Sequence, residues 1–231
     1  MEKMEKMEKM EKMEKMEKME KMQKPKNLKA IDCKIILVGD SGVGKTCIIE
    51  RYLKKYNPNV TCTINTSFYS QMEIIDSYQI NFLVWDTVGQ ERYRSLNSLF
   101  FKDAHICIFV YDITNEDSFN NIKDYWYESV ITNGAEGIIC GVAGNKSDLY
   151  IEEKVDKKEV EEFCKEINAT IKFVSAKADY GINELFEELG NIFVNSDFMK
   201  EIRESNYNKN ELEEKLNFGK TNKQLGKKGC C

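Results

Sequence analysis

Residues 39 to 46 read Gly39-Asp40-Ser41-Gly42-Val43-Gly44-Lys45-Thr46, a glycine-rich turn between two patterned segments. The apolar run Lys34 to Gly39 before it predicts a buried strand, and Lys45 to Tyr56 after it predicts a helix. Glycines let backbone N–H groups curl around phosphate oxygens, and a helix N-terminus favours anions. Lys45 would reach the β and γ phosphates of a nucleotide, and the Thr46 hydroxyl would bind Mg²⁺.

Strand-like and helical patterns alternate along the middle of the chain. We expect further strands at 68–75, 78–85, 104–112, 137–144 and 170–175, and helices at 117–132, 156–167 and 182–198. The first two of these strands, joined near Asp76-Ser77, would form one antiparallel pair. The alternation predicts an α/β sandwich with a mostly parallel sheet, in which ligands bind at the carboxyl ends of the strands.

Polar motifs follow three more of these strands. Trp85-Asp86-Thr87-Val88-Gly89-Gln90 supplies a carboxylate beside the metal, then a flexible glycine and an amide side chain. Asn145-Lys146-Ser147-Asp148 and Ser175-Ala176-Lys177 follow later strands. The Asp148 carboxylate can accept hydrogen bonds from the ring N–H and the exocyclic amine of guanine, a donor pair that adenine does not present. Each motif alone is weak evidence, but four at successive strand ends favour GTP as the nucleotide.

This order of motifs resembles the Ras superfamily of small GTPases, and the Rab branch in particular. The stretches 85–96 and 111–119 are similar to Rab sequences, and Phe68, Trp85 and Phe100 match the Rab aromatic triad. Without the resemblance, these three would be read as ordinary core or surface aromatics. The resemblance implies a P-loop NTPase with the small G-protein fold, built on a mostly parallel six-stranded sheet with helices on both faces.

The resemblance also implies a role for each motif residue. Phosphate binding falls to Ser41, Gly42, Val43, Gly44, Lys45, Thr46 and Cys47. Mg²⁺ would be held by Thr46 and Thr63, and by Asp86 through water. Guanine would be enclosed by Asn145, Lys146, Asp148, Ser175, Ala176 and Lys177, and covered by Tyr56. The Gly89 amide would contact the γ phosphate, and Gln90 would orient the attacking water as the catalytic residue.

Hydrolysis by this chain alone should be slow, because no arginine finger can be assigned in cis. An activating protein that supplies one could add on the order of 10³ to 10⁵ in rate. The main departures from the family are Asn65 where Rabs usually have Gly, Val88 beside Gly89 in place of Ala, and a first switch that is one residue shorter between Lys45 and Thr63. They put effector choice and hydrolysis rate in question.

The ends of the chain differ from its middle. We expect a low-complexity extension at 1–26 made of Met-Glu-Lys repeats, a GTPase domain at 31–198, and a flexible tail at 199–231. Five lysines of the tail follow its last acidic residue, Glu214, and either form a solvated tail or add modest attraction to anionic membranes. In the Rab resemblance, the terminal Cys230 and Cys231 both carry geranylgeranyl groups, and two chains give stable anchoring.

Composition narrows the partners. The 231-residue chain has a formal net charge of −5 and no basic face interleaved with aromatics, so no nucleic-acid partner is expected. It has no run of 18 apolar residues that would predict a transmembrane helix. Of its eight cysteines, six are interpreted as reduced thiols and two as lipid acceptors. The lone His105 opens an apolar strand and is interpreted as structural.

These observations predict a Rab-like GTPase that recruits effectors to the cytosolic face of an endomembrane, with a soluble cytoplasmic pool. Its expected partners are GTP and GDP, an exchange factor, a GTPase-activating protein, a dissociation inhibitor, the prenylation machinery and effectors. One alternative is a GTP-loaded scaffold with negligible hydrolysis, for which Asn65 and Val88 leave room. Another, a P-loop kinase, would need an acceptor-substrate domain and does not explain the Asn-Lys-x-Asp motif.

Overall fold

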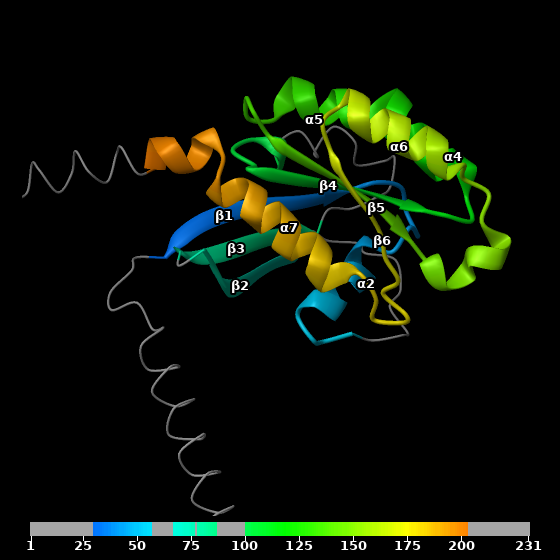
Figure 1. Cartoon of the computed structure of the whole chain (residues 1–231), viewed down its shortest axis with the longest axis horizontal. Coiled ribbons are helices and arrows are strands. Elements are labelled where there is room, and N and C mark those ends of the chain that lie inside the picture. The colour runs from blue at the N-terminus through cyan, green and yellow to red at the C-terminus, as the bar shows by residue number, and fades with distance from the viewer. Residues whose placement is uncertain (1–29, 57–66, 77, 87–99, 203–231) are drawn as a thin grey trace, which may run out of the picture.

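A six-stranded sheet organises the computed structural model, which describes residues 30–56, 67–76, 78–86 and 100–202 (Figure 1). Its strands stand in the order β2-β3-β1-β4-β5-β6. Their bounds are β1 Ile31–Val38, β2 Ser67–Ile75, β3 Tyr78–Asp86, β4 Ile106–Asp112, β5 Ile139–Asn145 and β6 Thr170–Phe173. Every pairing is parallel except the antiparallel pair β2 and β3. The predicted sheet and its single antiparallel pair are therefore confirmed.

The helices follow the predicted order, with shifted ends. They are α2 Lys45–Tyr52, α4 Glu116–Asn121, α5 Tyr127–Asn133, α6 Lys157–Glu166 and α7 Ile182–Val194, with a π-helical turn η2 Ile122–Trp126 and a 3₁₀ helix η3 Ser147–Glu152. The helix predicted from residue 45 ends at Tyr52 rather than Tyr56, because Lys54 adopts a left-handed backbone with φ of 57°. The helix expected at 117–132 is present but carries η2 in its middle.

Both faces of the sheet are covered by helices. Successive side chains along β4 show this, because they pack alternately into two different hydrophobic clusters. Ile106, Ile108 and Val110 pack into the cluster that includes α2 and α7. Cys107 and Phe109 point to the opposite cluster, which includes α4, η2, α5 and α6. A parallel strand covered by helices on both sides is expected to be apolar along its whole length, and all seven residues of β4 are buried. The predicted helices on both faces are thus confirmed; Figure 1 shows α7 lying across the strands.

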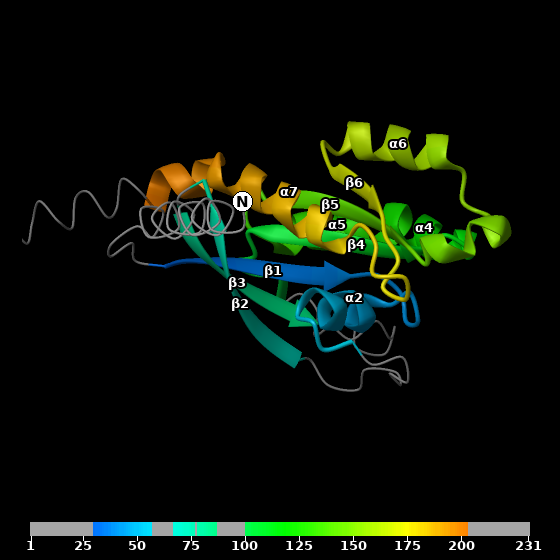
Figure 2. The same cartoon turned by 60° about the horizontal axis from the view of Figure 1, so that its bottom comes forward.

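The carboxyl ends of β1, β3, β4 and β5 meet at one edge of the sheet, because these strands run parallel. The glycine-rich turn leads from the end of β1 into α2 at this edge (Figure 2). It begins at Gly39, whose φ is 143° and where a Cβ would stand 2.1 Å from the Val110 carbonyl oxygen. Only glycine allows the backbone to come this close to β4.

None of the helices in the described part of the chain has both the length and the apolarity needed to cross a bilayer. The domain limits proposed at 26, 31 and 198 stay predictions.

Candidate functional site

Residues 39–46 connect β1 to α2 and are called the phosphate-type loop below. Lys45, at the start of α2, forms hydrogen bonds with the backbone of this loop. The Lys45 Nζ donates hydrogen bonds to the carbonyl oxygens of Gly39 and Asp40, both at 2.8 Å, and the residue is buried. Val43 is also buried, whereas Ser41 and Gly42 are exposed at the turn. The loop therefore wraps around the ammonium group and leaves its outer backbone accessible.

Gly44 completes this loop directly before α2. Its φ is 98°, and a Cβ there would lie 2.3 Å from the side-chain nitrogen of Asn145. Both the left-handed backbone and the close approach require glycine at this position. The first turn of α2 thus starts in contact with the end of β5.

A buried carboxylate stands beside the first turn of α2. The Thr46 hydroxyl donates to Asp86 Oδ2 at 2.7 Å, and Asp86 is fully buried at the end of β3. Burial raises the pKa of Asp86, against the hydrogen bond from Thr46 and the charge of Lys45, which lower it. Among the described residues, Asp86 Oδ1 has no hydrogen-bond partner. Mg²⁺ prefers oxygen ligands, so the pair of a hydroxyl and a lone buried carboxylate oxygen fits this ion.

A cavity of about 190 Å³ brings together predicted residues from four segments of the chain. Its lining comprises Gly42, Gly44, Cys47, Tyr56, Asn145, Lys146, Asp148, Leu149, Ala176 and Lys177. Of these, only Leu149 was not predicted from the motifs. The cavity adjoins the phosphate-type loop through its two glycines, so that one ligand could contact the loop and the cavity together.

Asn145 connects the loop before α2 to the segment after β6. Its side-chain nitrogen donates to the Val43 carbonyl oxygen at 2.8 Å, and its side-chain oxygen accepts from the Ala176 amide at 3.3 Å. The residue is 2% exposed. Its contacts within the described structure therefore hold the phosphate-type loop against the segment after β6.

Asp148 is oriented by that same segment. The Ser175 hydroxyl donates to Asp148 Oδ1 at 2.6 Å, and Lys177 Nζ lies 3.8 Å from Asp148 Oδ2. The Ala178 amide donates to the Ser175 hydroxyl at 2.9 Å, which fixes the turn. A carboxylate held in this way at the cavity is suited to accept two parallel N–H donors from a base edge.

Asp112, at the end of β4, is a residue whose role the motifs did not reveal. Its Oδ2 accepts from Lys146 Nζ at 2.6 Å, and its Oδ1 accepts from the Thr114 amide and hydroxyl at 2.9 and 2.8 Å. Burial favours a raised pKa for Asp112, but the hydrogen bonds from Lys146 and Thr114 outweigh it and hold the pKa below its usual range. The available signal was its place at a strand end, like Asp86.

Asp40 is a second such residue, within the phosphate-type loop itself. Its two carboxylate oxygens accept from Asn121 Nδ2 at 2.6 Å and Trp126 Nε1 at 2.9 Å. Both donors belong to the α4–η2 segment, and Trp126 is buried. No signal in the sequence connects the loop to these positions, which lie more than 80 residues away.

The predicted aromatic triad comes together on one face of the sheet. The ring centroids of Phe68 and Trp85 are 5.0 Å apart, and those of Trp85 and Phe100 are 5.9 Å apart. Phe68 is 51% exposed, so this cluster presents apolar surface to solvent.

Several predicted residues lie outside the described residues, and their roles stay predictions. They are Thr63, Gly89 and Gln90, the departures Asn65 and Val88, and the lipid acceptors Cys230 and Cys231.

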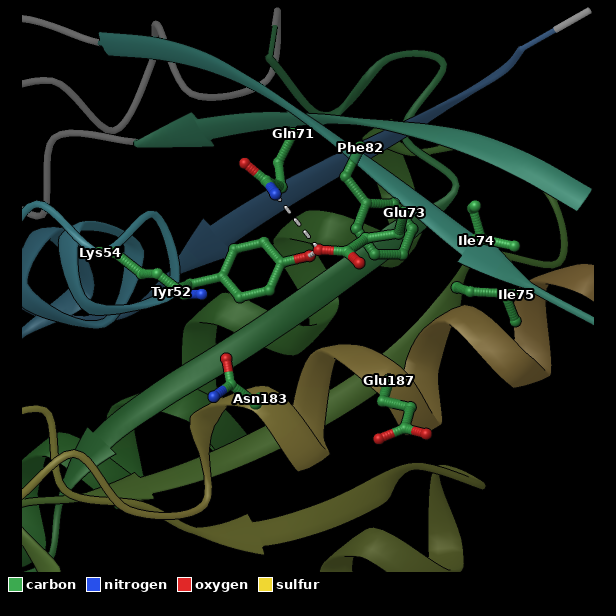
Figure 3. A pocket seen from close by; sticks show the side chains of 9 residues that line it. All are labelled: Tyr52, Lys54, Gln71, Glu73, Ile74, Ile75, Phe82, Asn183 and Glu187. Atoms are coloured by element: carbon green, nitrogen blue, oxygen red, sulfur yellow. Dashed lines mark hydrogen bonds between the residues drawn. The ribbon is translucent and has the colours of Figure 1, made fainter. Parts of the chain in front are cut away.

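A larger hollow of about 440 Å³ lies elsewhere, between the end of α2, strands β2 and β3, and α7 (Figure 3). In it the Tyr52 hydroxyl donates to Glu73 at 2.8 Å, and Gln71 lies within hydrogen-bond reach of the same carboxylate at 3.4 Å. None of its lining residues belongs to the predicted motifs. The motif residues therefore converge on the smaller cavity.

Comparison with known proteins gives a consistent family. A model of the Ras family matches residues 34–195. The chain is 36% identical over 159 residues to the human Ras-related protein Rab-22A, covering 68% of this chain and 81% of the relative. It is 36% identical over 157 residues to Rab-31 of Rattus norvegicus, covering 68% and 80%. It is 37% identical over 162 residues to human Rab-21, covering 70% and 72%.

Proposed function

We propose that this chain, which belongs to the Ras family of small GTPases and is related to Rab proteins, works as a membrane-bound switch in vesicle traffic. As a member of this family it binds GTP and GDP and hydrolyses GTP. The observation that carries the traffic role is the likeness to three Rab proteins.

The nucleotide would lie with its phosphates on residues 41–47 and its base in the cavity near Asp148. The buried Lys45 would donate to the β and γ phosphates in place of its present carbonyl partners. Mg²⁺ would be held by Thr46, Thr63 and, through water, Asp86, and it would neutralise charge on the phosphate oxygens. The buried Asp86 Oδ1, which has no hydrogen-bond partner within the described part of the chain, supports this assignment.

Hydrolysis would depend on positioning and charge stabilisation, since phosphoryl transfer leaves little covalent chemistry to the protein. Gln90 would orient the attacking water, and an activating protein would supply the missing arginine. Thr63 and Gly89 would be held by the γ phosphate and released after hydrolysis. GTPase switch segments generally change conformation in this way.

Effectors would bind the surface formed by residues 57–68 and 88–101. The cluster of exposed Phe68 with half-buried Trp85 and Phe100 supports this proposal, because grouped aromatic side chains are common at protein interfaces. An exchange factor, an activating protein and a dissociation inhibitor would control the cycle. Geranylgeranyl groups on Cys230 and Cys231, added by the prenylation machinery, would attach the protein to the cytosolic face of an endomembrane.

The test is single-turnover release of phosphate from protein loaded with radiolabelled GTP, with Gln90→Leu alongside. We expect slow release that the substitution abolishes. Tight GTP binding with no release from either protein would instead support the scaffold alternative. The membrane role is tested separately with the prenylated protein: partition into endomembrane fractions should be lost in the double variant Cys230→Ser/Cys231→Ser, and equal partition would contradict it.

A further inference from the structure

Arg51, in the last turn of α2, contacts two segments that line the cavity of about 190 Å³ near Asp148, which is called the base cavity below. One segment contains Ala176 and Lys177, and the other contains Tyr56. The Arg51 Nε donates to the Ala176 carbonyl oxygen at 2.7 Å, and its Nη2 donates to the Lys177 carbonyl oxygen at 3.2 Å. Its Cζ lies 3.7 Å from the ring centroid of Tyr56. Asp179 Oδ1 also lies near the guanidinium, 3.8 Å from Nε.

These contacts require the shape of a guanidinium group. It is flat and carries several donors along its edge, so it can donate to two carbonyls while its face covers an aromatic ring. A lysine ammonium could also donate to two carbonyls, as Lys45 does in the loop before α2, but it has no plane to stack on the ring. The Arg51 side chain is 20% exposed, so water screens these interactions only in part.

The contacted residues are walls of the cavity, whereas Arg51 is not part of its lining. Ala176, Lys177 and Tyr56 all belong to the lining. The same turn also orients Asp148 through Ser175. Arg51 therefore reaches the bound base only through the residues that it holds.

We propose that Arg51 is a positioning residue that sets the rate of guanine-nucleotide release and sharpens selectivity for guanine. By fixing residues 176 and 177 and stacking on Tyr56, it keeps the base cavity closed around its ligand. The proposal rests on guanine-nucleotide binding, which belongs to the family, and is independent of the role in vesicle traffic.

Release of fluorescent N-methylanthraniloyl-GDP tests the first part, measured on the full chain with Mg²⁺ and excess unlabelled GDP. Arg51→Ala should accelerate release roughly 10- to 100-fold, the effect of losing charge-assisted hydrogen bonds and a cation–π contact. Arg51→Lys should fall between Arg51→Ala and the natural protein. Lys55→Ala is the matched control, because Lys55 is an exposed cation four residues further on, and it should release at the natural rate.

Inosine diphosphate separates positioning from a general loss of stability. It lacks the exocyclic amine that Asp148 would accept from, so the natural protein should release it faster than GDP. Arg51→Ala removes the hydrogen bonds that fix the 175–178 turn. The ratio of the inosine diphosphate release rate to the GDP release rate should therefore shrink by about threefold or more, which corresponds to about 0.7 kcal/mol of selectivity.

Two results would overturn the proposal. One is release from Arg51→Ala at the natural rate. The other is an equal acceleration for GDP and inosine diphosphate, because that pattern is what a merely weakened fold would produce. If Arg51→Ala does not fold, Arg51→Lys carries both measurements, and tryptophan fluorescence verifies that it is folded at the assay temperature.

Discussion

Replacing Asp112 by Asn tests whether the ion pair with Asp112 holds Lys146 of the Asn-Lys-x-Asp motif in place. The substitution keeps the size of the side chain and leaves Oδ1 able to accept from the Thr114 amide and hydroxyl. At the Oδ2 position, however, an amide NH₂ would face Lys146 Nζ, which now donates to that oxygen at 2.6 Å. Two donors would then meet, and the lysine would lose its partner.

The expected cost follows from the exposure of the pair. A hydrogen bond between charged groups contributes about 1.5–3 kcal/mol when it is protected from water. The Asp112 side chain is 12% exposed, but that of Lys146 is 35% exposed, so solvent screening reduces the value. We therefore expect Asp112→Asn to lower the free energy of unfolding of the nucleotide-free protein by about 1–2 kcal/mol.

The pH dependence has a definite sign. Because the pKa of Asp112 is lowered in the folded protein, its contribution is fully present above the unfolded-state pKa of about 3.9. It is lost only as the pH falls through the still lower folded-state pKa. The difference between the natural protein and Asp112→Asn should therefore stay constant between about pH 5 and pH 8, and narrow below about pH 4.

Urea unfolding followed by tryptophan fluorescence measures this difference, since Trp126 is buried and reports on the fold. Asp124→Asn, an exposed acid of η2, is the control and should change stability by less than about 0.5 kcal/mol. A loss below about 0.3 kcal/mol in Asp112→Asn, or one that disappears near neutral pH, would refute the assigned pair. In addition, GDP should leave the variant faster, because Lys146 lines the cavity.

Three further substitutions test other contacts. Gly44→Ala should cost about 2–4 kcal/mol in urea unfolding, because φ is 98° and the new Cβ would stand 2.3 Å from the Asn145 side-chain nitrogen; a loss under 1 kcal/mol would contradict the close approach. Tyr52→Phe removes only the 2.8 Å hydrogen bond to Glu73 and should cost about 0.5–1.5 kcal/mol, with no change in denaturant m-value. Asp86→Asn keeps the size of the side chain but removes the buried negative charge that would act on Mg²⁺ through water. The same variant should lose the acceleration of GDP release that chelation of Mg²⁺ causes in the natural protein, and an unchanged response would contradict the metal assignment.

The sheet was predictable because its pattern is local. Residues 104–112 were predicted as a strand from their apolar run, and β4 occupies Ile106–Asp112. The antiparallel pair was visible from the short connection near Asp76. Helix ends were less predictable, because they depend on single backbone conformations. The positive φ of Lys54 stops α2, and nothing in the periodicity of the sequence marks that residue.

The motif residues of the site were predictable for the same reason. Lys45 and Asp148 each sit a few positions after a strand, and parallel strands bring those positions to one edge. Their supports were not predictable. Asp40 and Trp126 are 86 positions apart, and Arg51 and Ala176 are 125 apart. Such pairs are fixed by the packing of helices on the finished sheet, which no short pattern encodes.

These contacts connect the phosphate-type loop and the base cavity to each other. The Asn145 side chain contacts Val43 on one side and Ala176 on the other, and Arg51 holds that same alanine from α2. Since α2 begins at Lys45, the helix is tied to the phosphate loop at its first residue and to the base cavity at its last turn. A substitution at either place must therefore disturb both, and the effects of Gly44→Ala and Arg51→Ala on GDP release should be non-additive, because they strain a shared set of contacts.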